Sequence, residues 1–152
     1  MKKIIIIFGL ILLNSCGFKV INNEQFNKYY IAQINSKGDN KINYRIKNKI
    51  TTSSNATNKT PVVINLDTKK EKSIKEKNIR NEITKYTLKI NVSGNIKLLN
   101  SSKLKYFKII KTGSYSVADR YTDTRNNENK LTKNLANEIA KDINNQLRLI
   151  LE

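Results

Sequence analysis

The sequence predicts an α+β fold, a two-layer sandwich in which two helices pack on a mostly antiparallel four-stranded sheet, in the chain order β-α-β-β-β-α. Two patterns indicate this fold. Residues 84–92 alternate between apolar and polar side chains, which is the period of a strand with one dry face and one wet face. Near the C-terminus, apolar residues recur at every fourth position, as in a helix with one apolar stripe. Two such helices on one face of a sheet bury both patterns in a single core.

The first strand and the first helix are expected within residues 29–50. Residues 29–34 read Tyr-Tyr-Ile-Ala-Gln-Ile, a short strand that is ended by the Ser-Lys-Gly turn at residues 36–38. Asp39 or Asn40 then caps a helix, on which Ile42, Ile46 and Ile50 form one narrow apolar stripe. The opposite side of this helix is expected to be polar and carries Lys41, Asn43, Lys47, Asn48 and Lys49.

A hairpin is expected after a polar loop. Residues 51–60 are rich in Thr, Ser and Asn and show no periodicity, which indicates a loop before Pro61. The second strand begins there, with Val62, Ile64 and Leu66 on one face. The third strand covers residues 84–92, and its dry face carries Tyr86, Leu88, Ile90 and Val92. Between these strands we expect a charged hairpin tip from about residue 69 to residue 81.

The last strand and the final helix follow Gly94 and a turn at residues 100–102. The strand is expected from about Lys103 to Val117. Its apolar alternation slips at residues 106–107 and again at residues 109–110, which is compatible with a β-bulge. The final helix is the strongest helical signal of the chain, because its apolar residues are spaced by four. These residues are Leu131, Leu135, Ile139, Ile143 and Leu147.

The first sixteen residues have the pattern of a bacterial lipoprotein signal. Two lysines precede an apolar stretch from residue 4 to residue 13, and residues 13–16 read Leu-Asn-Ser-Cys. Ten helical residues rise only about 15 Å, too little for a permanent span of a hydrocarbon core of about 30 Å. We therefore expect residues 1–15 to be a removed signal peptide, residues 16–28 a lipidated N-terminus and tether, and residues 29–152 a single domain. The alternative is an uncleaved signal anchor.

Composition excludes several classes of chemistry. The chain has no His and no Trp, and Cys16 is its one cysteine, so catalytic triads and the usual zinc sites are excluded and a lipidated Cys16 leaves no thiolate. Residues 102–105 fit the pattern S-x-x-K, which chance supplies in a lysine-rich chain. Asp119 and Asp123 are expected to be solvated charges beside nearby arginines. We therefore expect no enzyme, no catalytic residue, no metal and no cofactor besides the covalent diacylglycerol and N-acyl chain on Cys16.

The chain is strongly basic. It has 29 Lys and Arg residues against 12 Asp and Glu, a formal net charge of +17 that falls to +15 when Lys2 and Lys3 leave with the signal peptide. Such a charge attracts phosphate, lipid headgroups or nucleic acid through long-range fields, and it does not select among them.

Two stretches of the chain, together with the order of the predicted elements, resemble the LptE family, the lipopolysaccharide-assembly lipoproteins of the outer membrane, over essentially the whole mature domain. One is the lipid-bearing start Cys-Gly-Phe-Lys at residues 16–19. The other runs from Ser-Tyr-Ser-Val at residues 114–117, through Arg-Asn-Asn-Glu at residues 125–128, to Gln146 and Leu147 of the final helix. The resemblance implies a non-enzymatic subunit that sits inside the LptD barrel, acts as its plug and assembly partner, and binds lipopolysaccharide. No nucleic-acid partner is then expected.

The resemblance also implies where lipopolysaccharide binds. In the family, basic residues at the turn between the second and third strands and just before the last helix are implicated. Matched onto this chain, the first place falls on Arg80, with Lys77 close by, and the second falls on Arg125, with Arg120 nearby. Arginine suits the phosphates of lipid A because its planar fork makes bidentate contacts.

The expected location and barrel contact follow from the same resemblance. Gly17 after the cysteine, in place of Asp, favours sorting to the outer membrane, with the anchor in the periplasmic leaflet. Polar residues such as Lys85, Thr87 and Asn91 on the wet sheet face are compatible with the polar lumen of a barrel, and equally with bulk water.

A second hypothesis comes from the charge alone. The chain would then be a periplasm-facing lipoprotein that binds an acidic polymer through its basic surface. A barrel plug should depend on its barrel for solubility or stability and should co-purify with it, whereas a polymer binder should be soluble, monomeric and strongly salt-sensitive.

Overall fold

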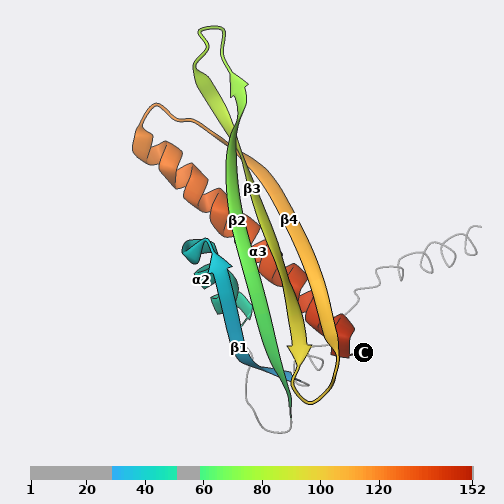
Figure 1. Ribbon diagram of the computed structural model, residues 1–152. Coiled ribbons are helices and arrows are strands. Elements are labelled where there is room, and N and C mark those ends of the chain that lie inside the picture. Colours follow the sequence, from blue (N-terminus) through green and yellow to red (C-terminus); the bar gives the residue numbers. More distant parts are fainter. Residues whose placement is uncertain (1–28, 51–58, 152) are drawn as a thin grey trace, which may run out of the picture.

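A computed structural model describes residues 29–50 and 59–151 of the chain. The expected signal peptide, Cys16, the tether and most of the loop at residues 51–60 lie outside the described residues. The elements are β1 (Tyr29–Gly38), α2 (Asn40–Ile50), β2 (Thr60–Lys77), β3 (Ile83–Leu98), β4 (Leu104–Ser116) and α3 (Tyr121–Leu151), as Figure 1 shows. The predicted order β-α-β-β-β-α and the α+β class are confirmed.

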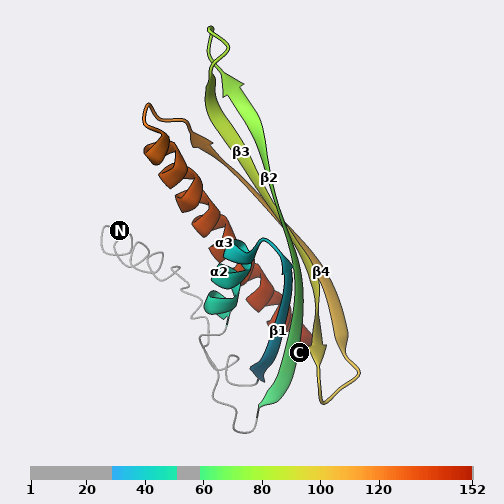
Figure 2. The ribbon, with the colours of Figure 1, turned by 60° about the vertical axis from the view of Figure 1, so that its left-hand side comes forward.

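The sheet has four strands in the order β1-β2-β3-β4. β1 pairs with β2 in parallel, and the two other pairs are antiparallel, so the sheet is mostly antiparallel as predicted. A parallel pair needs a crossover connection, which α2 supplies. Both helices lie on one face of the sheet, and the β2–β3 hairpin extends past the end of this two-layer body (Figure 2). Neither of the two described helices is long and apolar enough to cross a membrane.

The core lies between the sheet and the helices and is made by the stripes that the sequence shows. Ile46 of α2, Ile90 of β3 and Ile139 of α3 each have 0% exposure. Burying one such side chain contributes about 1.5–3 kcal/mol, so the stripes account for the side on which each helix packs. Gly113 of β4 lets α3 come close, because a Cβ at this position would lie 2.7 Å from Cδ1 of Leu131.

The turn between β1 and α2 confirms one expectation and corrects another. Gly38 has φ 87°, a left-handed conformation that glycine adopts without strain, and Oδ1 of Asp39 accepts a hydrogen bond from the backbone N–H of Ile42 at 3.0 Å. Asn43, which was expected on the polar side of α2, is in fact 3% exposed. Its Nδ2 donates to the Lys37 carbonyl at 2.8 Å, and the Thr68 hydroxyl donates to its Oδ1 at 2.6 Å. These bonds satisfy a buried amide, and they fasten α2 to β1 and β2.

The hairpin differs from the sequence prediction. The expected tip from residue 69 to residue 81 was too long, because β2 continues to Lys77 and the turn occupies only residues 78–82. β3 also continues through Gly94 to Leu98. The outer half of β2 is exposed on every side chain from residue 69 to residue 77. With no buried face, the sequence there has no apolar alternation by which a strand is recognised.

β4 is an edge strand and carries no bulge against β3. The pairing runs without a register shift from Lys85 opposite Ser116 to Lys97 opposite Leu104. Phe107 and Ile109 point into the core, whereas Tyr106 and Ile110 are exposed on the outer face of the sheet. The slipped alternation therefore reflects apolar residues on both faces, and the β-bulge considered from the sequence is absent from this pair. The register shifts occur instead between β1 and β2 at residues 31–33 and near the end of the β2–β3 hairpin.

Candidate functional site

The hairpin tip, defined here as residues 77–82, holds two of the predicted basic residues. Asn78 closes the turn, since its Oδ1 accepts the backbone N–H groups of Arg80 and Glu82, each at 2.9 Å. The Arg80 side chain is 77% exposed, and its Nε lies 3.7 Å from a carboxylate oxygen of Glu82. Lys77 donates from Nζ to Oδ1 of Asn81 at 2.8 Å. An exposed pair at such a distance is weak, so the Arg80 guanidinium is available to a ligand.

An apolar side chain lies beside these cations. Ile79 is fully exposed at the hairpin tip, and Ile74, before it on β2, is 51% exposed. A β-branched side chain held out in water at a turn makes no contribution to the core. The hairpin tip therefore presents a cation and an apolar group next to each other.

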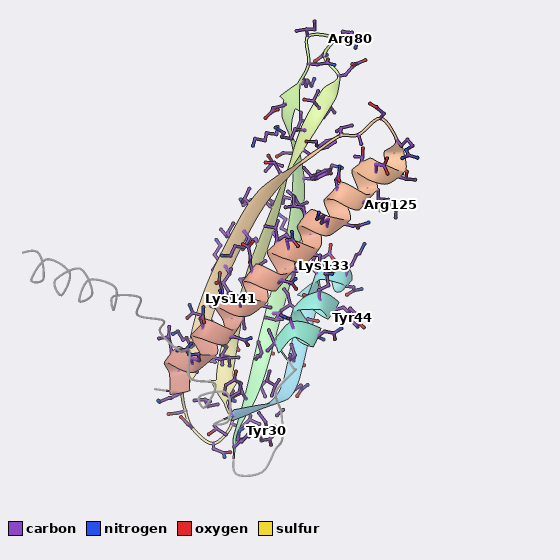
Figure 3. All side chains as sticks on the ribbon, turned by 180° about the vertical axis from the view of Figure 1, so that it is seen from behind. Tyr30, Tyr44, Arg80, Arg125, Lys133 and Lys141 are labelled. Carbon is purple, nitrogen blue, oxygen red and sulfur yellow. The ribbon has the colours of Figure 1, made fainter. Side chains whose placement is uncertain are left out.

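The second predicted pair lies at the start of α3. Arg120 precedes the helix, with its side chain 82% exposed and its Nε 3.0 Å from Oδ2 of Asp123. Arg125 was expected just before this helix but lies within it, because α3 already begins at Tyr121; it is exposed and forms no ion pair within the described residues. Figure 3 places Arg125 and Arg80 toward the same end of the molecule, on different elements. The structure thus brings Arg80 together with Lys77, and Arg125 together with Arg120, while the two pairs remain separate groups.

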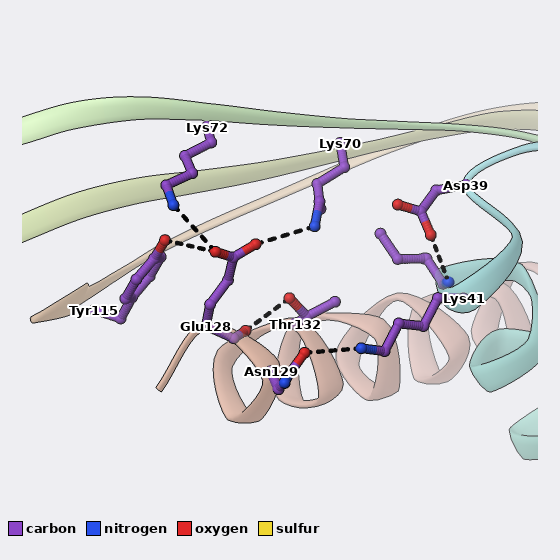
Figure 4. Close-up of polar contacts among 9 residues, drawn as sticks. Asp39, Lys41, Lys70, Lys72, Tyr115, Glu128, Asn129 and Thr132 are labelled. Atoms are coloured by element: carbon purple, nitrogen blue, oxygen red, sulfur yellow. Dashed lines mark hydrogen bonds and ion pairs between the residues drawn. The ribbon is translucent and has the colours of Figure 1, made fainter. Parts of the chain in front are cut away.

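A polar cluster that the sequence analysis missed lies where the strands of the hairpin contact α3. We call it the Glu128 cluster: Lys70, Lys72, Tyr86, Tyr115 and Glu128. Lys70 and Lys72 each place Nζ 3.1 Å from an oxygen of Glu128, and the Tyr115 hydroxyl donates to the same carboxylate at 2.8 Å (Figure 4). The Lys72 ammonium also lies 4.0 Å from the centre of the Tyr86 ring, which stacks on Tyr115. The cluster therefore joins β2, β3 and β4 to the first turns of α3.

Charge interactions stabilise the ionised form of Glu128 in this cluster. Partial burial alone would raise the pKa of Glu128, but the hydrogen bonds from Tyr115, Lys70 and Lys72 outweigh it and lower the pKa to about 2. Burial, with the hydrogen bond to Glu128 in support, raises the pKa of Tyr115. Two lysines against one carboxylate leave a net positive charge on the helix-facing side of the hairpin. Lysines at i and i+2 on one strand face are the sequence signal that could have revealed it.

A second basic region lies between the helices. A groove of about 610 Å³ is lined by Lys41, Tyr44, Arg45, Asn48, Lys49, Lys133 and Asn137, none of which is acidic. Tyr44 on α2 and Lys133 on α3 flank it (Figure 3). Because a groove of one charge sign concentrates counter-ions, this groove attracts anionic ligands. We refer to it as the interhelical groove.

The described residues contain no group of acidic, His or Cys side chains that could hold a metal. Asp119 is exposed, and Asp123 pairs with Arg120, so neither forms part of a carboxylate pair. Among the described residues, the arrangement therefore offers cationic binding surfaces.

Comparison with known proteins gives relatives by fold. No protein-family model matches the sequence, and no curated protein matches it. A rare lipoprotein B of Shewanella oneidensis has 14% identity and a TM-score of 0.56, and the match covers 76% of this chain and 92% of that one. A lipoprotein B of Nitrosomonas europaea has 15% identity and a TM-score of 0.56, over 76% and 79% of the two chains. A minor lipoprotein of Acinetobacter baumannii has 14% identity and a TM-score of 0.53, over 80% and 94%. At these identities the likeness shows a shared fold, and the proteins that share it are bacterial lipoproteins.

Proposed function

We propose that the chain is an outer-membrane lipoprotein subunit of a lipopolysaccharide translocon, which plugs and helps to assemble an LptD-type barrel and binds lipopolysaccharide. The observation that carries the proposal is the basic hairpin that extends past the two-layer body. The lipoprotein signal ending at Cys16 supports it, and so does the fold shared with bacterial lipoproteins. The acyl chains on Cys16 would hold the domain on the periplasmic side of the outer membrane.

The chemistry of the hairpin end suits an amphipathic anion. Lipopolysaccharide combines phosphates with acyl chains, and Arg80 and Ile79 offer a guanidinium and an apolar side chain at adjacent positions. Arg125 adds a second exposed guanidinium at the same end of the molecule. The Glu128 cluster, on the same hairpin and helix, adds a net positive charge that attracts the same ligand.

The sheet supports the barrel contact. Its outer face turns away from the helices and carries polar side chains such as Lys85, Thr87 and Asn91 at outward positions of β3. A polar face of this kind fits the polar lumen of a large barrel. The elongated shape of the domain, with a hairpin at one end, suits insertion along a barrel axis.

Ligand binding is tested by reversing charges in two places. The double variant Arg80→Glu/Arg125→Glu should weaken binding of purified lipopolysaccharide at least about tenfold, since two guanidiniums become carboxylates. The matched control is Lys41→Glu/Lys133→Glu in the interhelical groove, which changes the net charge by the same amount. Equal affinity of the first variant and the original chain would disprove the assignment to Arg80 and Arg125.

Partner binding is tested on the full chain in a Gram-negative envelope. A C-terminally tagged chain is extracted gently, and mass spectrometry identifies the co-purified proteins and the modification of Cys16. A large outer-membrane barrel in about equimolar amount, on a chain acylated at Cys16, is the expected result. An acylated chain with no barrel would refute the plug while leaving the lipid anchor intact.

The interhelical groove favours a second candidate function, the binding of an acidic polymer by a periplasm-facing lipoprotein. Its lining of four basic side chains and no carboxylate is the observation behind it. In this case Lys41→Glu/Lys133→Glu should weaken binding of a polyanion such as polyphosphate, with affinity falling steeply as salt rises. Arg80→Glu/Arg125→Glu should leave that binding largely unchanged, so the same two variants separate the two functions.

A further inference from the structure

The outer face of the sheet carries a row of hydrogen-bonded amides. Asn35 of β1 lies opposite Asn65 of β2, which lies opposite Asn95 of β3. Asn35 donates from Nδ2 to Oδ1 of Asn65 at 2.9 Å, and Asn65 donates to Oδ1 of Asn95 at 2.8 Å. Gln33 begins the series by donating to Oδ1 of Asn35 at 2.8 Å. We call these four residues the amide row.

Every bond in the amide row points the same way. Such a chain polarises its members and holds each amide in one orientation. Each asparagine amide has two N–H donors and two acceptor positions, of which the row uses only part. At the far end, Asn95 donates to no other described residue. The row therefore holds hydrogen-bond donors and acceptors in fixed orientations at the surface. Folding does not require these bonds, because water could satisfy the same amides.

An exposed aromatic ring continues the row onto the edge strand. Tyr106 of β4 lies opposite Asn95, and it is 73% exposed. Opposite residues of an antiparallel pair have Cβ atoms about 5 Å apart, so the ring lies next to the last amide. Asp67, one outward position along β2 from Asn65, forms no ion pair and no side-chain hydrogen bond with any described residue.

These side chains line one groove. Its volume is about 820 Å³, within the range of small-molecule sites, and Asn35, Asn65, Asp67, Asn95 and Tyr106 are among the residues around it. The groove crosses the outer face of the sheet and reaches the edge at β1, where Lys47 of α2 also lines it. It shares no lining residue with the interhelical groove.

We propose that this groove binds a pyranose ring of a saccharide. A pyranose has an apolar face of C–H groups and a rim of hydroxyls, each of which both donates and accepts. The Tyr106 ring offers a flat apolar surface to the first, and the amide row offers alternating donors and acceptors to the second. Asp67 accepts two further hydroxyl hydrogens. The barrel contact proposed above uses Lys85, Thr87 and Asn91, which lie nearer the hairpin on the same face. The groove at Asn95 and Tyr106 is a separate part of that face, so this inference does not depend on the proposed function.

The test uses the full chain, labelled with ¹⁵N, in lauryldimethylamine oxide micelles, because a detergent with a sugar headgroup would compete. Maltotriose and triacetylchitotriose are the probes, added to millimolar concentrations. At least one of them should shift the side-chain amide signals of Asn65 and Asn95. If neither sugar shifts these signals, the proposal is overturned.

Two tyrosine variants identify the place of binding. Tyr106→Ala removes the stacking surface without touching the core and should weaken sugar binding about tenfold or more. Tyr44→Ala is the matched control, because Tyr44 is 68% exposed and lies on α2. Shifts that survive Tyr106→Ala, or that Tyr44→Ala abolishes equally, would show binding elsewhere and overturn the assignment.

Discussion

Replacing Glu128 by Gln tests whether charge holds the start of α3 against the hairpin. The substitution keeps the shape of the side chain and removes its negative charge, so Lys70 and Lys72 lose their common partner. The pKa of Glu128 is about 2 in the folded chain against an ordinary value of 4.5. This gap corresponds to about 3 kcal/mol of stability, and solvent screening at a side chain that keeps 22% exposure reduces it to about 1–2 kcal/mol.

The pH dependence has a definite sign. Because folding lowers the pKa of Glu128, its stabilisation is fully present above pH 4.5 and is lost as the pH falls toward 2. The difference in unfolding free energy between the original chain and Glu128→Gln should therefore shrink to less than half between pH 7 and pH 3.

Urea unfolding followed by circular dichroism at both pH values measures this difference. Glu138→Gln is the control, because its exposed carboxylate lies 4.0 Å from Lys111 and should contribute little. If Glu128→Gln costs the same free energy at pH 7 and at pH 3, the cluster acts through packing and the electrostatic reasoning is refuted.

Three further substitutions test the fold. Gly38→Ala should cost about 2 kcal/mol, since Gly38 has φ 87° and a Cβ there would collide with the Thr68 carbonyl; an unchanged urea midpoint would contradict this. Asn43→Ala should cost about 1–3 kcal/mol through the buried Lys37 and Thr68 groups it leaves unpaired, and a smaller loss in Asn43→Ala/Thr68→Val than in Asn43→Ala alone would confirm it. Ile139→Ala should lower stability by about 2–5 kcal/mol in thermal unfolding, whereas a loss below about 1 kcal/mol would deny it a core position.

The helices were predictable because each has one buried face. An apolar stripe predicts which side of a helix meets the sheet. The structure confirms this for the stripe through Ile42 and Ile46 and for the stripe through Ile139. The outer half of β2 could not be predicted, because a strand exposed on both faces has no apolar period. Asn43 was wrongly predicted to be exposed, because it is polar. Its burial depends on hydrogen bonds to groups on β1 and β2, which the helical pattern does not reveal.

The candidate sites divide in the same way. Arg80 was placed correctly on a hairpin turn, because local sequence marks that position, whereas Arg125 was expected just before the last helix and lies within it, since α3 begins at Tyr121. Their role in binding stays a prediction. The Glu128 cluster and the amide row depend on strand register, which brings together residues such as Asn35 and Asn65 from separate strands. Alternation gives the face of a strand but not its partner across the sheet, so neither group was visible in the sequence.

The open edge at β4 affects how copies of this protein meet. An edge strand has unpaired backbone groups that can recruit another strand, and β4 adds exposed Leu104, Tyr106 and Ile110 to that tendency. Lys105 and Lys108 lie on the same strand and face opposite sides of the sheet. Two copies that approached edge to edge would bring like charges together on both faces, which opposes aggregation through this edge. The lysines therefore oppose self-association at an edge strand that carries three exposed apolar side chains.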